Sequence, residues 1–158
     1  MIRLQFVAGT DVGAHLIQWF GGGPAFSHVD TVMPDGRLLG ARSDVVGGAP
    51  AGVQIRDASY VGTEKVLQIN IPATDRQTKI YYDFVQSQIG KDYDELGIVA
   101  FVAGRDWRDP SAWFCSELVA TGLERAGVVL PLASPTNKIT PPDLILILSA
   151  ILPVTMPT

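Results

Sequence analysis

The feature that most constrains this chain is its single cysteine, Cys115, which stands directly before an apolar stretch with helical spacing. The apolar residues that share one side of this predicted helix are Leu118, Val119, Leu123 and Ala126. Gly127 follows them and is typical of the position just past a helix C-terminus. We therefore expect Cys115 in the first turn of a helix.

A cysteine at a helix start is well placed to act as a nucleophile. Unpaired backbone N–H groups and the positive end of the helix dipole favour the thiolate, which is the reactive form. The same N–H groups can hold an oxyanion that forms on a substrate carbonyl. The structural alternative is a small buried apolar residue, the commonest role of a lone cysteine. The pattern around Cys115 leaves both interpretations open.

Length and composition indicate a single folded domain over residues 1–158. Charged residues make up 18% of the chain and apolar residues 47%, which argues against disorder. The net charge of −4 and the lack of a basic run argue against a nucleic-acid partner. One cysteine excludes an internal disulfide.

The two ends of the chain give no sign of a membrane or export segment. The N-terminus alternates like a strand and then turns polar at Thr10 and Asp11, so no signal peptide is expected and the protein is predicted to be cytoplasmic or phage-delivered. The apolar run at 144–154 is too short for the roughly 20 residues that span a bilayer. We expect it to dock on the domain, with contact to a membrane surface as the alternative, and we expect no transmembrane segment.

Periodicity predicts an α+β domain in which an antiparallel sheet packs against helices. Strands are expected at 2–8, 26–33, 37–42, 53–56 and 65–71, and the last four are assigned to the sheet. Helices are expected at 10–20, 75–89, 94–103, 115–126 and from Pro141 onward.

His28 is the histidine that the pattern singles out. The other, His15, is interpreted as a packing or surface residue of the first helix. Strand alternation places His28 and Asp30 on one face of the 26–33 strand. A histidine on a strand beside a cysteine at a helix start is the arrangement that papain-like hydrolases use. That interpretation requires the fold to bring His28 close to Cys115 and to leave the sulfur an opening to solvent.

Several motifs, in their order along the chain, carry a resemblance to a known family. They read FSHVD, PDGRLLGAR, GKDYDELGI, WFCSELV and TPPDL. This series resembles the circularly permuted branch of the NlpC/P60 superfamily of cysteine peptidases and amidases, which includes bacterial amidase-like proteins and the lecithin:retinol acyltransferase group. The resemblance runs from about Phe6 to Asp143. It implies a papain-like fold in which the histidine strand precedes the cysteine helix.

The resemblance assigns roles residue by residue. Cys115 matches the nucleophile and His28 the general base. Tyr93 is similar to a tyrosine that lines the site, although a half-buried packing role is as reasonable. Trp113 and Ser116, on either side of the Phe114–Cys115 pair, are further candidates for substrate binding, with a core position as the alternative for the tryptophan.

One position departs from the family pattern. The family usually places a polar residue, which orients the imidazole, on the strand after the histidine strand, and here that slot falls on Gly40. Asp30 is the candidate replacement, since it shares the face of His28 and can reach the ring directly or through water. The absence of the usual residue favours a degenerate enzyme.

Together these patterns predict a cysteine hydrolase of the peptidase or amidase class that acts through Cys115 and His28. Its substrate is expected to be a small molecule, a peptide or a lipid amide, with a peptidoglycan peptide link as the first choice, in a bacterial or phage setting. The alternatives are a thioester-forming acyltransferase or lipid esterase, and a catalytically inactive binding module. No cofactor and no metal are expected, because no second histidine or cysteine joins the acidic residues at 92–95.

Overall fold

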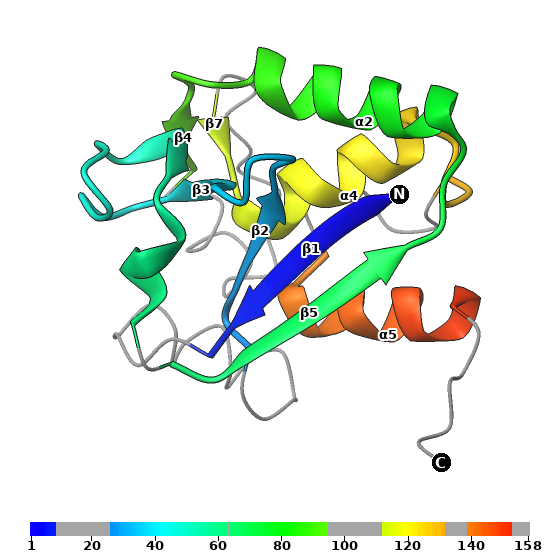
Figure 1. Cartoon of the computed structure of the whole chain (residues 1–158), viewed down its shortest axis with the longest axis horizontal. Coiled ribbons are helices and arrows are strands. Elements are labelled where there is room, and N and C mark those ends of the chain that lie inside the picture. Colours follow the sequence, from blue (N-terminus) through cyan, green and yellow to red (C-terminus); the bar gives the residue numbers. More distant parts are fainter. Residues whose placement is uncertain (9–25, 63, 95–111, 132–138, 153–158) are drawn as a thin grey trace.

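The computed structural model describes residues 1–8, 26–62, 64–94, 112–131 and 139–152, which form an α+β fold (Figure 1). The strands of the main sheet are β1 (Ile2–Val7), β2 (His28–Val32), β3 (Leu38–Arg42), β4 (Gly52–Arg56) and β5 (Val66–Ile71). A short 3-10 helix, η1 (Ala58–Val61), lies between β4 and β5. The helices are α2 (Asp75–Ser87), α4 (Cys115–Arg125) and α5 (Pro141–Ile151). Two short parallel strands, β6 (Asp92–Tyr93) and β7 (Ala112–Trp113), complete the described elements.

The five-stranded sheet is antiparallel and has the order β4-β3-β2-β1-β5. The predicted strands are confirmed, but the predicted sheet omitted the first one, which is an interior strand between β2 and the edge strand β5. Leu4 of β1, for example, pairs with Thr31 on one side and Ile69 on the other. Alternation identifies a strand but not its neighbours, so the interior position of β1 had no local signal.

The helices begin where the sequence predicts. Thr74 caps α2 by accepting a hydrogen bond from the backbone of Gln77, whose side chain returns to the Thr74 backbone. Gly127 lies just past α4 with φ +65°, as the glycine stop requires. The predicted helix 75–89 was too long at its end: Ile89 lies beyond α2 and is 42% exposed, while Tyr81 within the helix is fully buried. The helices predicted at 10–20 and 94–103 fall outside the described residues.

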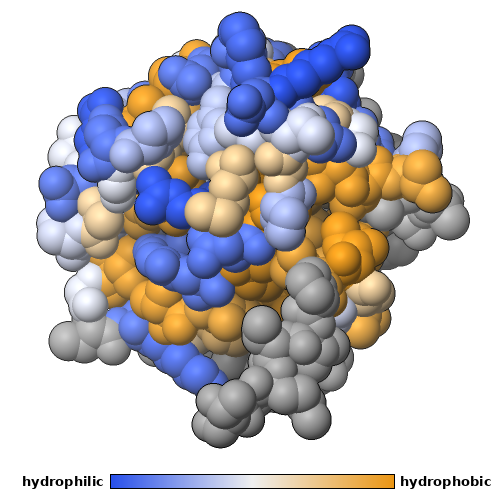
Figure 2. Space-filling model, turned by 45° about the vertical axis from the view of Figure 1, so that its right-hand side comes forward, coloured by the Kyte–Doolittle hydropathy of each residue, from blue (hydrophilic) through white to orange (hydrophobic). Residues whose placement is uncertain are grey.

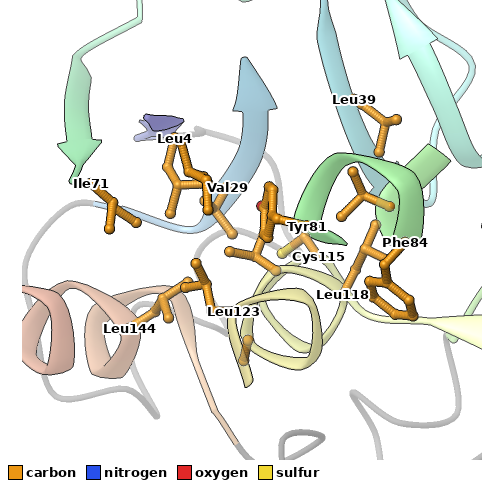
Figure 3. Packing of buried hydrophobic residues seen from close by; sticks show 14 of the residues in the cluster. Leu4, Val29, Leu39, Ile71, Tyr81, Phe84, Cys115, Leu118, Leu123 and Leu144 are labelled. Atoms are coloured by element: carbon orange, nitrogen blue, oxygen red, sulfur yellow. The ribbon is translucent and has the colours of Figure 1, made fainter. Parts of the chain in front are cut away.

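One face of the sheet and the three helices share the main hydrophobic core (Figure 3). Leu4, Val29 and Leu39 project from the sheet, and Leu118 and Leu123 from α4 meet them, all with 0% of their surface exposed. Each such side chain contributes roughly 2–3 kcal/mol by burial, so this core fixes α4 against the sheet.

The opposite face of the sheet carries a second, smaller cluster under η1. It consists of Val7, Val32, Leu38 and Val61, with Tyr60 packed against it. Because the sheet is covered on both sides here, every residue of β2 is buried. Polar side chains on this strand therefore need partners inside the protein.

The apolar stretch near the C-terminus docks on the domain, as predicted. It forms α5, which buries Leu144 and Leu148 in the main core. Apolar residues also reach the surface of the molecule (Figure 2), and α5 leaves Leu146 70% exposed. Within the described ranges, no helix combines the length and the hydropathy that crossing a bilayer requires.

Candidate functional site

The first residue of α4 is Cys115, which confirms its predicted place at a helix start. The N-cap residue, Phe114, has no side-chain acceptor, so no N-cap side chain accepts a hydrogen bond from the first N–H groups of the helix. Helix α4 packs against β2 and β3. This packing carries the N-terminus of α4 to the strand that holds His28.

His28 is hydrogen-bonded to Asp30 within β2. The distance from Nε2 of His28 to Oδ1 of Asp30 is 2.8 Å, and the residues are 9% and 1% exposed. Alternation placed both side chains on one face, and the structure adds that they meet directly, without a bridging water. With Nε2 engaged by the carboxylate, Nδ1 is the ring nitrogen left for another partner.

Cys115 lies close enough to His28 for its side chain to influence the imidazole. Burial lowers the pKa of His28, but the charge and hydrogen bond of Asp30, together with Cys115, outweigh it and raise the pKa to about 9. Burial also raises the pKa of Asp30, and the neighbouring His28 reverses that effect and holds it below its ordinary value. The buried pair is therefore an imidazolium and a carboxylate at neutral pH.

This pair predicts a pH-dependent stability. The pKa of His28 rises from 6.5 to about 9 on folding, so its contribution is complete below pH 6.5 and is lost as the pH rises through 9. Over this window, we expect the free energy of unfolding of the native protein to fall by about 2–3 kcal/mol more than that of His28→Gln. Denaturant titrations at pH 6 and pH 9.5 measure the difference, and an equal pH dependence in both proteins would contradict it.

Gly40 lies beside the Asp30 carboxylate on the neighbouring strand. A Cβ atom built on Gly40 would stand 1.9 Å from Oδ1 of Asp30, far inside van der Waals contact. The space that a side chain on β3 would use is filled by the carboxylate that β2 supplies. Gly40 is thus the residue that leaves Asp30 the space to reach His28.

Tyr60 is a site residue that sequence reasoning missed. Its hydroxyl donates a hydrogen bond to Oδ2 of Asp30, and the guanidinium of Arg42 lies 5.0 Å from the centre of its ring. Arg42 in turn binds both carboxylate oxygens of Asp44, at 2.7 and 2.9 Å. Tyr60 comes from a short 3-10 turn with no hydrophobic period, so only the fold reveals its contact with Asp30.

Arg56 was also missed, because it ends a strand in the sequence and suggests an exposed residue. Its side chain is instead 1% exposed and donates to the carbonyl oxygens of Gly40, at 3.1 Å, and Pro50, at 2.7 Å. These bonds tie β3 to the loop before β4. They support the strand that flanks the Asp30 carboxylate.

Trp113 and Ser116 do not direct their side chains at Cys115 and His28, the two residues called the dyad from here on. The Trp113 indole is buried, donates to Gln88 at 3.1 Å and meets Phe84 edge-on at 5.8 Å. The Ser116 hydroxyl is buried and donates to the backbone of Ile139. Both side chains thus serve packing contacts, and their role in substrate binding stays a prediction.

Tyr93 takes an intermediate position. It is half-buried at the end of β6, and its ring lies 6.1 Å from that of Phe114, the residue before Cys115. It therefore borders the start of α4. His15, interpreted above as a packing or surface residue, lies outside the described residues.

Cys115 itself is 1% exposed and belongs to the main core (Figure 3). The hydrolase interpretation required proximity to His28 and an opening to the sulfur. The first requirement is met, while the second is not met in the structure as described. A substrate reaches the sulfur only after the atoms that cover it move.

The described residues include no group of three or more histidine, cysteine, aspartate or glutamate side chains that could hold a metal ion.

No family model matches the sequence, and no curated protein matches it.

Proposed function

We propose that this protein is a papain-like cysteine hydrolase that cleaves an amide bond through Cys115 and His28. The observation that carries the proposal is the buried His28–Asp30 ion pair, with Cys115 close to the imidazole at the first position of α4. An imidazolium beside a thiol favours the thiolate, which is the attacking species.

The proposed reaction proceeds through a thioester. The thiolate of Cys115 attacks the amide carbon, a C–S bond forms, and the N–H groups at the start of α4 hold the oxyanion. His28 gives its proton to the amide nitrogen, the C–N bond breaks, and the amine leaves. Water then loses a proton to His28 and attacks the thioester, which releases the acid and restores the thiolate. Asp30 keeps the ring oriented throughout.

The proposed substrate is a peptide or lipid amide, and a peptidoglycan peptide link is the first to test because the motifs of the chain resemble those of the NlpC/P60 superfamily. The same thioester supports acyl transfer if an alcohol or amine takes the place of water. Product analysis in the presence of an added amine separates the two reactions.

A binding module of the same fold without catalysis is the second candidate. The burial of Cys115 at 1% exposure favours it, because an inert cysteine is commonly a small core residue. The two candidates differ in thiol chemistry. In a module without catalysis, Cys115 behaves as an ordinary thiol with no dependence on His28.

Alkylation by iodoacetamide tests the proposal, since Cys115 is the single cysteine and all modification reports on it. An ordinary thiol is about 300-fold less reactive at pH 6 than at pH 9.5. We expect the native protein to react at pH 6 at a rate within about threefold of its rate at pH 9.5. In His28→Ala, the ratio of the rate at pH 6 to the rate at pH 9.5 should be about 100-fold lower than in the native protein, as for an ordinary thiol. Burial of the sulfur slows alkylation equally at both pH values. The ratio of the two rates therefore reports ionisation of the thiol and not access to it.

The hydrolase proposal is wrong, and the binding module is favoured, if the native protein and His28→Ala have the same pH profile and both alkylation rates rise with pH as for an ordinary thiol. If the profiles separate as expected, cell-wall peptides and acyl esters are then offered in turn as substrates.

A further inference from the structure

We infer that Tyr60 is a positioning residue of the candidate dyad, which fixes the Asp30 carboxylate and through it the orientation of His28. The inference rests on the proposed function and deepens it. It extends the site beyond β2 and α4 to η1, which the sequence motifs do not include.

The two oxygens of Asp30 have separate partners. Oδ1 accepts from Nε2 of His28 at 2.8 Å, and Oδ2 accepts from the hydroxyl of Tyr60. Two donors on opposite oxygens fix the rotation of the carboxylate, which the broad torsion of an aspartate otherwise leaves free. With Tyr60 in place, Oδ1 stays directed at the imidazole.

The Tyr60 hydroxyl is a donor throughout the physiological range. Burial and the adjacent charge of Asp30 raise the pKa of Tyr60 well above its ordinary 10. The phenol therefore keeps its proton, and the hydrogen bond to Asp30 runs in one direction.

Tyr60 is itself held firmly in place. Asp57 caps η1 by accepting from the backbone N–H of Ser59 at 2.9 Å, and Val61 anchors the turn in the second hydrophobic cluster. Arg42 covers the ring, and its own position is set by Asp44. A rigid support of this kind is what an orienting hydrogen bond requires.

The charged and titratable groups that face Asp30 come from four elements. They are His28 of β2, Arg42 of β3, Arg56 of β4 and Tyr60 of η1. Burial raises the pKa of Asp30, whereas His28, Tyr60 and Arg42 lower it. Loss of the Tyr60 hydroxyl therefore raises the pKa of Asp30. As the pH falls, Asp30 is then protonated at a higher pH than in the native protein, and His28 loses its charged partner.

The test compares Tyr60→Phe with Tyr82→Phe in the full chain by iodoacetamide alkylation from pH 3 to pH 10. Tyr82 is a matched control because its half-buried hydroxyl also bonds to β2, donating to the carbonyl of Val32 at 2.9 Å, away from Asp30. We expect Tyr60→Phe to move the acid limb of the profile up by about one pH unit and to lower the rate on that limb about tenfold. Tyr82→Phe should keep the native profile.

The outcomes separate the inference from the proposed function. If Tyr60→Phe melts at a lower temperature but keeps the native pH profile, Tyr60 is only structural and the inference is overturned. The inference also fails if both tyrosine variants shift the profile equally. The His28→Ala variant is measured beside them: if it matches the native protein, the proposed function fails as well, whereas a clear separation leaves that function standing.

Discussion

Asp30→Asn is expected to return the pKa of His28 from about 9 to its ordinary 6.5 or lower. Burial alone lowers this pKa, and the charge of Asp30 is the largest of the causes that raise it. An asparagine keeps the shape of the side chain but removes the charge. His28 would then be largely neutral at pH 7.5, and the proposed reaction would lose the imidazolium that donates the proton to the leaving group.

NMR titration of the imidazole measures this shift directly. The chain has two histidines, so the His15→Gln background identifies the signal of His28. We also expect the alkylation rate at pH 6, relative to that at pH 9.5, to fall about 100-fold. Asp35→Asn is the control, because Asp35 is exposed and pairs with Arg37 in the turn after β2. A pKa of His28 that stays near 9 in Asp30→Asn would show that the carboxylate does not set the charge of the ring.

The local elements of this fold were predictable because their signals are local. Alternation identified the strands, and the threonine before each of α2 and α5 marked a helix start. The same alternation placed His28 and Asp30 on one face, which gave the centre of the site. The placement of β1 between β2 and β5 depends on long-range pairing, which no local pattern encodes.

The site shows the same division between local and long-range information. Gly40 suggested a lost catalytic group when its position was compared with a family pattern. In three dimensions it has a different meaning, because its missing Cβ is the space that Asp30 uses. Tyr60 and Arg56 gave no signal at all, since their significance comes from the buried carboxylate and strand that they contact.

The burial of Cys115 follows from the packing of α4 against the sheet. Helix α4 begins against the sheet, so the residue that receives the helix dipole is also pressed into the core. Reactivity and access are therefore separate properties of this site. A pH profile measures the first property, and an absolute alkylation rate measures the second.

Gly40→Ala is expected to disable the dyad without touching either of its members. The new methyl group would stand 1.9 Å from Oδ1 and 3.1 Å from Cγ of Asp30, so the carboxylate has to move. Its 2.8 Å bond to His28 would break, and the pKa of His28 should fall as in Asp30→Asn. We expect the ratio of the alkylation rate at pH 6 to that at pH 9.5 to fall about 100-fold. Overpacking should also lower the free energy of unfolding by about 1–3 kcal/mol.

Gly122→Ala separates the loss of the dyad from overpacking in general. Its added Cβ would lie 2.8 Å from the ring of Tyr81 and 3.3 Å from that of Phe84, between α2 and α4 and away from Asp30. The variant should lose stability while His28 keeps a pKa of about 9 and Cys115 keeps its alkylation profile. If Gly40→Ala instead behaves like Gly122→Ala, the space beside Asp30 is a packing detail, and the orientation of His28 does not depend on it.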